Sequence, residues 1–349
     1  MPRRIDYTAL LYSVPRAEIA AYRRELRQNQ TSRWNRAIAP DVMTVVVVVF
    51  ALVMGGLVLT SFDGVLFRVS PVFTTILTVF GIGLAALALR GTFTSRNWET
   101  MLRLSRFATA NSLHYTQSAG DPEYPGSIFG LGTARRVFNR LRATEGRAVE
   151  IANYRYTTGS GKDRRVHNWG YLAMRLDRRL PHMLLDARAN NGMFGLSNLP
   201  TSFSKNQVLS LEGDFNKYFT LYCPKAYERD ALYVFTPDLM ALLIDNAAPF
   251  DVEIVDDWML VYSAKPFASA DPAVYQRLFQ IVDTVGSKTL SQSHRYVDER
   301  IGEFAPNIVA PQGQRLHSGV SFGAVVAFVV SLAVWIGLKF FDLPDLFGG

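Results

Sequence analysis

Two uncharged stretches in the first quarter of the chain constrain its fold more than any other feature. Residues 42–62 and 69–89 each run for 21 residues without a charged side chain. As helices, each would span roughly 30 Å, the thickness of the hydrocarbon core of a bilayer. Because only residues 63–68 separate them, the pair is predicted to form a transmembrane helical hairpin. A third uncharged stretch, residues 320–338, predicts one more transmembrane helix near the C-terminus.

These spans predict how the rest of the chain is organised. A basic N-terminal arm (1–41) precedes the hairpin (42–89), and a soluble domain follows it (91–319). After the third span (320–338) comes a short tail (339–349). The soluble domain is long enough to bury a hydrophobic core.

The net charge of +7 is concentrated beside the first span. Residues 1–40 carry eight arginines against three acidic residues, which is typical of a topology signal and argues against nucleic-acid binding. The positive-inside rule then predicts a multi-pass plasma-membrane protein whose N-terminus and soluble domain are cytoplasmic. Contact with the lipid bilayer and its anionic headgroups is expected from the arginines before the span: Arg23, Arg24, Arg27, Arg33 and Arg36.

Glycines within the first two spans predict close helix packing. Small residues let helix backbones approach each other in a bilayer. The hairpin would pack on itself, on the third span or on another copy of the chain through four positions: Gly55, Gly56, Gly81 and Gly83.

The first half of the soluble domain has the composition of an antiparallel sheet. A turn cluster at 159–163 and the dipeptide Arg178-Arg179 would join neighbouring strands as hairpins. A further strand at about 136–143 would complete a four-stranded sheet, and Ser127–Phe129 predicts one more short strand. The three main strands are rich in β-branched and aromatic side chains: residues 149–158, 169–176 and 182–187.

The second half mixes hairpins with helices, so the soluble domain is predicted to be α+β, an antiparallel sheet with several helices. Residues 207–212 and 217–223 flank a Gly-Asp-Phe-Asn turn and predict one hairpin. Residues 251–255 and 258–263 predict a second, with Asp256-Asp257 in its turn.

Helix starts are indicated by two polar residues, each followed by proline. Thr236 and Asp271 are predicted N-caps. The helix after Asp271 carries one apolar stripe, and Gly286 is expected to end or kink it.

Asp251, Glu253, Asp256 and Asp257 form the densest group of carboxylates. A metal site would need their oxygens to converge on one point. Strand alternation predicts that Asp251 and Glu253 point outward with Val252 inward, and aspartate is common in turns. A solvated strand edge followed by a turn is therefore the favoured interpretation, and a metal-assisted site is the alternative.

Other candidate motifs favour structural roles. The segment 159–162 (Gly-Ser-Gly-Lys) differs from a phosphate-binding loop at Tyr156 and Asp163, so a hairpin tip is the better interpretation. His182 and Asp186 would share a strand face, either as a proton-transfer pair or as an ordinary surface pair. Cys223 is expected to be a small buried hydrophobe. No residue is therefore predicted to be catalytic, to bind a cofactor or to ligate a metal.

Much of the soluble domain resembles a family of uncharacterised actinobacterial integral membrane proteins with no assigned activity. The resemblance implies a bacterial plasma-membrane protein and transfers no functional residue. It rests on four stretches: NYRYTTGSGKDRR (153–165), WGYLAMRLDRRLPHMLLDARANN (169–191), LSLEGDFNKYFTLYCPKAYERDALYVFTPDLMALLID (209–245) and FDVEIVDDWMLVYS (250–263).

These features predict a protein that presents a cytoplasmic α+β domain at the inner face of the plasma membrane. Its role would be binding or scaffolding with a protein partner that the sequence does not identify, and no cofactor is expected. The alternative is a membrane-anchored enzyme, such as a hydrolase, that uses the acidic cluster at residues 251–257. A third hypothesis is sensing of the membrane surface by residues 1–40.

Overall fold

The computed structural model divides the chain into two compact units. One contains residues 1–7 and 108–349, and the other contains residues 8–107. Within them, the structure describes residues 5–29, 98–192, 197–267, 270–298 and 307–318, together with residues 331, 332 and 335.

Among these described residues, no helix is both long and apolar enough to cross a bilayer. Helix α2 (Arg16–Asn29), for example, has 14 residues and contains four arginines, and at about 1.5 Å per residue it would span only about 21 Å. This finding corrects the predicted fold class, which included three transmembrane helices, and the multi-pass plasma-membrane location that rested on them. The described residues give an antiparallel sheet with helices.

The predicted spans themselves lie almost wholly outside the described residues. None of 42–62 or 69–89 is described, and of 320–338 only residues 331, 332 and 335 are. The glycine contacts expected within the hairpin therefore stay a prediction.

The smaller unit contains α1 (Thr8–Leu11), α2 and most of a helix over residues 98–110. Arg106 of this last helix forms an ion pair with Glu18 of α2. Arg23 places its guanidinium 5.7 Å from the centre of the Trp98 ring, a distance at which a cation is attracted to the face of an indole. Arg33 and Arg36 lie outside the described residues, so the lipid contact expected of this arginine group stays a prediction.

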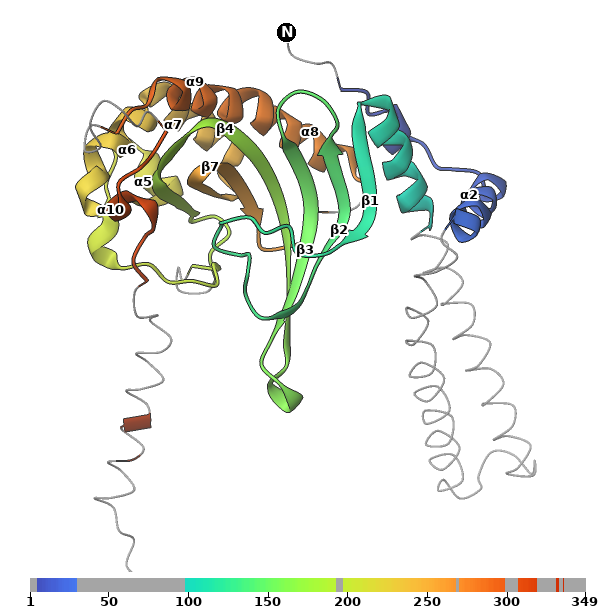
Figure 1. Ribbon diagram of the computed structural model, residues 1–349, viewed down its shortest axis with the longest axis horizontal. Helices are drawn as coiled ribbons and strands as arrows, with labels where there is room; N and C mark the ends of the chain where they lie inside the picture. The colour runs from blue at the N-terminus through green and yellow to red at the C-terminus, as the bar shows by residue number, and fades with distance from the viewer. Residues whose placement is uncertain are drawn as a thin grey trace, which may run out of the picture. The chain divides into compact units, whose positions relative to one another are not determined.

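The larger unit is built on a seven-stranded antiparallel sheet (Figure 1). The hydrogen-bonded order is β1-β2-β3-β4-β6-β5, and β7 also pairs with β4. Because β7 occupies one side of β4 along most of its length, β3 and β6 both pair with the other side. The strands are β1 (Leu113–Ala119), β2 (Thr133–Ala143), β3 (Val149–Thr158), β4 (Arg165–Ala187), β5 (Val208–Leu209), β6 (Phe219–Tyr222) and β7 (Asp251–Ser263).

Strands β4 and β7 are much longer than predicted, and they pair with each other. β4 continues without a break through Arg178-Arg179, and β7 continues through Asp256-Asp257. The hairpins predicted at these two dipeptides are therefore wrong. Instead, the register shifts on either side of Leu180, which pairs with Asp256. Asp256 has a φ of +52°. Bulges thus replace turns, because a bulge accommodates extra residues without ending the strand.

Most of the other expected strands are confirmed. β2 and β3 correspond to the predicted segments, and β5 and β6 form the predicted hairpin in a shorter version. A one-turn helix, α5 (Phe215–Tyr218), fills the loop of that hairpin. Ser127–Phe129 is a turn rather than a strand, because the N–H of Phe129 bonds to the carbonyl of Gly126 at 3.0 Å. Strand β1 was not predicted.

Two helices, α6 (Glu228–Val234) and α7 (Pro237–Ala247), lie between β6 and β7 in the sequence. Two more, α8 (Pro272–Ile281) and α9 (Ser287–Arg295), follow β7. Asp271 caps α8 as predicted, since its side chain accepts a 3.0 Å hydrogen bond from the N–H of Ala273. Thr236 occupies the N-cap position of α7 without a capping bond from its side chain. At Gly286 the chain does not stop: a π-helical turn, η6 (Val282–Gly286), joins α8 to α9.

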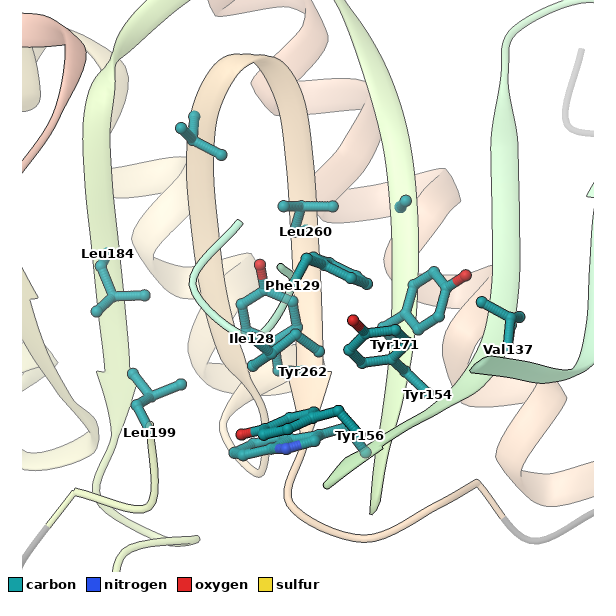
Figure 2. Packing of buried hydrophobic residues seen from close by; sticks show 14 of the residues in the cluster. Ile128, Phe129, Val137, Tyr154, Tyr156, Tyr171, Leu184, Leu199, Leu260 and Tyr262 are labelled. Carbon is teal, nitrogen blue, oxygen red and sulfur yellow. The ribbon is translucent and has the colours of Figure 1, made fainter. Parts of the chain in front are cut away.

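Helices and loops cover opposite faces of the sheet. On the helix-covered face, Met174 of β4 reaches Gly286, where an added Cβ would lie 2.8 Å from its sulfur. On the other face, the ring of Phe129 lies 4.9 Å from Tyr154 and 5.1 Å from Tyr171. Figure 2 shows these rings over the strands with the helices behind them. The loop that carries Ile128 and Phe129 thus closes this face of the core.

Gly170 of β4 is predicted to be essential for packing of Phe267. A Cβ at Gly170 would lie 2.7 to 2.9 Å from the Phe267 ring. Phe267 is held in place because its N–H donates a 2.7 Å hydrogen bond to Asn153 Oδ1. We expect Gly170→Ala to lower the free energy of unfolding by about 1–3 kcal/mol, as overpacking typically does. Urea denaturation of the full-length protein measures this.

Gly120 provides the matched control. An added Cβ there meets no atom within 4 Å, so Gly120→Ala should change the unfolding free energy by less than about 0.5 kcal/mol. Equal effects of the two alanine substitutions would contradict this account of the packing.

Candidate functional site

Buried ionisable groups gather on the loop-covered face of the sheet. They come from three strands that are adjacent in the sheet, β3, β4 and β7. Carboxylates are costly to bury unless each finds partners. The contacts of each group therefore indicate its role. The group consists of Glu150 (2% exposed), His182 (5%), Asp186 (4%), Asp251 (0%) and Glu253 (0%).

Glu253 accepts four hydrogen bonds, which occupy both of its oxygens. Its Oε1 accepts from His182 Nε2 at 2.6 Å and from Ser127 Oγ at 2.7 Å. Its Oε2 accepts from the Ser127 N–H at 2.8 Å and from the Tyr262 hydroxyl at 2.7 Å. Gly126 makes this approach possible, because an added Cβ there would overlap the Tyr262 hydroxyl at 1.9 Å.

The imidazole of His182 is fixed in one tautomer. Its Nδ1 accepts a 3.0 Å hydrogen bond from the N–H of Leu316. Nε2 must therefore carry the proton that it donates to Glu253, and the ring is neutral. Both ring nitrogens are used, so the Glu253–His182 pair ties the Leu316 segment to the sheet.

The pKa of Glu253 lies below its usual value. Burial alone would raise the pKa, but the hydrogen bond from His182 and the two donors of Ser127 outweigh it. Glu253 is therefore ionised at neutral pH. Since the folded-state pKa is depressed, the stability that this group contributes is present above its ordinary pKa and is lost as pH falls through the lowered value.

Asp186 and Asp251 form a second buried pair on the same face. The β4–β7 pairing ends at Leu185 and Val252, and Asp186 and Asp251 are the next residues of the two strands, near enough for the charge of Asp186 to act on Asp251. The N–H of Ala187 donates to Asp251 Oδ1 at 2.8 Å. Asp251 Oδ2 and Asp186 Oδ1 are buried and have no hydrogen-bond partner.

The pKa of Asp251 shifts in the opposite direction to that of Glu253. Burial raises the pKa of Asp251 to about 7, and the neighbouring charge of Asp186 adds to this; the Ala187 N–H and the side chains of Asn190 and Asn198 oppose it through hydrogen bonds. The pKa of Asp186 is also raised, chiefly by burial. Two carboxylates on one strand, two residues apart, thus differ because only Glu253 has a full set of donors.

Glu150 of β3 is the third buried carboxylate. It accepts a 2.5 Å hydrogen bond from the Tyr171 hydroxyl, and it faces the guanidinium groups of Arg142 at 3.7 Å and Arg140 at 3.9 Å. Its charge is balanced within the fold, as a structural ion pair requires.

A cleft of about 410 Å³ opens at the N-terminal end of β4. His167 stacks on Tyr156 with ring centroids 4.7 Å apart, and its Nε2 bonds to Thr158 Oγ1 at 2.8 Å. The amide oxygen of Asn198 is buried without a hydrogen-bond partner, and its side chain also interacts with Asp251. Besides the imidazole of His167, the lining contains no acidic or basic side chain. It consists of Val166, His167, Asn168, Trp169, Asn198, Ala264 and Pro266.

The structure separates the four carboxylates of the predicted acidic cluster. Asp256 binds the guanidinium of Arg315 at 2.8 Å, and Asp257 binds that of Arg175 at 2.9 Å. Asp251 and Glu253 are fully buried with different partners, so the predicted solvated strand edge is wrong for these two residues. The reason is that β7 is covered on both faces, and alternation along it does not separate core from solvent.

The other predicted motifs have simple outcomes. The segment 159–162 lies at the tip of the β3–β4 hairpin, as predicted, and ends in the one-turn helix η2 (Gly161–Asp163). Cys223 is buried as expected, and burial raises the pKa of its thiol to about 12. His182 and Asp186 share a face of β4, but His182 bonds to Glu253 rather than to Asp186. In the part of the chain that the structure describes, no group of three or more His, Cys, Asp or Glu residues is placed to hold a metal.

Sequence reasoning missed the contacts between Glu253, His182 and Ser127. These residues come from three segments that are far apart in the sequence, so no local spacing reveals them. One signal was present: Glu253 stands between Val252 and Ile254 in a run that is apolar at neighbouring positions. A charge in a strand buried on both faces requires buried partners.

Comparisons with known proteins give little further information. No protein-family model matches the chain, and no curated protein matches it. Among solved structures, the crystal structure of the mycobacterial trehalose monomycolate transport factor A, TtfA, is similar over 55% of this chain and 91% of that chain, with 14% identity and a TM-score of 0.36. A similarity at that TM-score carries no argument about this chain.

Glu253→Gln is predicted to destabilise the fold strongly. Each oxygen of Glu253 faces one N–H that cannot turn away, from Ser127 on one side and from His182 on the other. Either orientation of a glutamine amide therefore sets its NH₂ group against a donor. We expect a loss of about 3 kcal/mol in the free energy of unfolding, measured by urea denaturation.

The control is Asp257→Asn, which removes a carboxylate from a partly exposed ion pair with Arg175. Such pairs contribute about 0–1 kcal/mol. A loss in Glu253→Gln no larger than in this control would contradict the assigned role of Glu253.

Asp251 is predicted to make the protein less stable as pH rises. Because its folded-state pKa is raised to about 7, its favourable contribution is complete below the unfolded-state pKa and is lost as pH rises from about 4 to about 7. The loss is on the order of 4 kcal/mol for a shift of this size. Urea denaturation in metal-free buffer, at pH 4.5, 6 and 7.5, should show the difference between wild type and Asp251→Asn changing across this range. A constant difference would refute the prediction.

Proposed function

We propose that this chain is a binding protein whose ligand is a small, uncharged polar molecule held in the cleft at the N-terminal end of β4. The observation that carries the proposal is the cleft itself. Its volume of about 410 Å³ falls within the range of small-molecule sites.

The lining of the cleft suggests the chemistry of the ligand. Val166, Ala264 and Pro266 supply apolar surface, and the amides of Asn168 and Asn198 each offer a donor and an acceptor. The Asn198 amide oxygen is buried without a hydrogen-bond partner, so a ligand that donates a hydrogen bond would satisfy it. The absence of carboxylate, ammonium or guanidinium groups among the lining residues favours an uncharged ligand.

The geometry supports binding better than catalysis. An enzyme needs a nucleophile or a general base within reach of its substrate. The Glu253–His182 pair resembles such a base, but its two members are 0% and 5% exposed. His167 does line the cleft, yet its ring is already stacked and hydrogen-bonded within the β3–β4 hairpin. The enzyme hypothesis required the carboxylates at residues 251–257 to converge, and they hold separate partners.

Obstruction of the cleft tests this proposal. Ala264 is exposed and lines the cleft, so Ala264→Trp would place an indole in the space that a ligand needs. A library of small uncharged polar compounds is screened against the full-length protein by saturation-transfer NMR. We expect compounds that bind wild type to lose at least ten-fold in affinity for Ala264→Trp.

Lys265→Trp is the matched control, because Lys265 is exposed, adjacent and absent from the lining. It should bind the same compounds as wild type. The proposal fails if no compound binds wild type at millimolar concentration, or if the compounds that bind do so equally well in Ala264→Trp.

A further inference from the structure

We propose that the far end of the β3–β4 hairpin docks on an anionic phospholipid surface. This hairpin extends beyond the other strands of the sheet and ends in an isolated tip (Figure 1). Every residue from 159 to 166 is exposed. The proposal does not rest on the ligand cleft described above, although Val166 borders both.

The end of the hairpin is strongly basic. Residues 162–165 read Lys-Asp-Arg-Arg. On the strands behind them, Arg136 of β2 pairs directly with Arg155 of β3, and like charges opposite each other destabilise a sheet. Arg155 is oriented rather than neutralised: its Nε donates to Asn168 Oδ1 at 3.1 Å, and its guanidinium lies 5.1 Å from the centre of the Phe138 ring.

These cations have no acidic partners among the described residues. Arg135 is paired with Asp121 at 2.6 Å, so the local carboxylate is already used, and Asp163 is exposed in the tip. Like charges without counter-ions repel one another, and an anionic partner would relieve the repulsion. We call the five cations that form no ion pair in the described chain the basic end: Arg136, Arg155, Lys162, Arg164 and Arg165.

The layout of the basic end indicates an extended partner rather than one small anion. Arg155 lies four residues before the turn at Gly159, which is about 13 Å along a strand. A single phosphate cannot contact both places, whereas the many phosphates of an anionic membrane can.

An exposed aliphatic side chain lies among these charges. Val166 is 49% exposed. It pairs with Thr157, which places it on the same face of the hairpin as Arg155 because side chains alternate along a strand. An apolar side chain flanked by cations suits the boundary between headgroups and acyl chains.

A nucleic acid is the other extended polyanion, and the basic end fits it less well. Single strands are held largely by bases that stack on exposed aromatic rings. Residues 155–168 contain the rings of Tyr156 and His167, which stack on each other with centroids 4.7 Å apart. Tyr156 is also only 1% exposed, so neither ring is offered to a base.

A fluorophore at the tip of the hairpin tests the proposal in the full-length protein. The single cysteine, Cys223, is buried, so Ser160→Cys supplies the exposed thiol for a nitrobenzoxadiazole dye. The dye reports on the tip alone, however the rest of the chain associates with lipid. We expect vesicles of phosphatidylglycerol and phosphatidylcholine, in a ratio of about 1:2, to shift its emission to the blue, and pure phosphatidylcholine vesicles to leave it unchanged. Raising the salt from about 50 mM to about 500 mM should weaken the response, because exposed charges are screened.

Charge-removing variants locate the contact. Arg164 and Arg165 are both exposed, so Arg164→Gln/Arg165→Gln leaves the core intact. Each basic residue near an anionic surface raises affinity about five-fold, and we expect this double variant to lose at least about ten-fold. Lys225→Gln/Arg229→Gln is the matched control, since it removes the same charge from exposed residues of η5 (Lys225–Tyr227) and α6. It should bind as wild type does.

Four results would overturn docking on lipid. They are no response of the dye to phosphatidylglycerol vesicles, an equal response to pure phosphatidylcholine, unchanged affinity in Arg164→Gln/Arg165→Gln, and an equal response to single-stranded RNA at the same phosphate concentration. The last result would assign the basic end to nucleic acid instead. None of these outcomes depends on the Ala264→Trp test, so the two proposals fail or succeed separately.

Discussion

The four hydrogen bonds to Glu253 are the interaction on which the rest of the larger unit depends. The carboxylate is fully buried, and its partners are Ser127 in a loop, His182 in β4 and Tyr262 further along β7 itself. His182 extends the network, because its second nitrogen holds the N–H of Leu316. One buried charge therefore fixes the loop and the C-terminal segment that cover this face. Removal of the charge would leave several donors unsatisfied at once.

The same strand contains a carboxylate in the opposite situation. Asp251 lies two residues before Glu253 on the same face, but one of its oxygens has no hydrogen-bond partner and the charge of Asp186 acts on it. The low pKa of Glu253 and the high pKa of Asp251 follow from this difference in partners rather than from a difference in burial. Satisfied buried charges stabilise a fold, whereas unsatisfied ones often mark functional sites.

Sequence patterns predicted the local elements well and the long-range arrangement poorly. The helix cap at Asp271 and the strand at 149–158 depend on neighbouring residues, and both are confirmed. The hairpins predicted at Arg178-Arg179 and Asp256-Asp257 are wrong because charged pairs also occur at bulges, and pairing between β4 and β7 decides which forms. The burial of Asp251 and Glu253 could not be read from alternation, since coverage of both faces of β7 is a property of the tertiary fold. The cleft likewise joins β4 to Asn198 and Pro266, which no sequence spacing connects.

The most direct test of the role of Glu253 is native-state amide hydrogen exchange in wild type and Glu253→Gln. The Ser127 N–H bonds to Glu253 itself, and the Leu316 N–H depends on it through His182. The Phe267 N–H, which bonds to Asn153, belongs to a separate contact. The account predicts that Ser127 and Leu316 lose protection together in the variant while Phe267 keeps it. Unchanged protection at Leu316, or loss at all three amides to the same extent, would contradict the claim that Glu253 specifically holds these two segments.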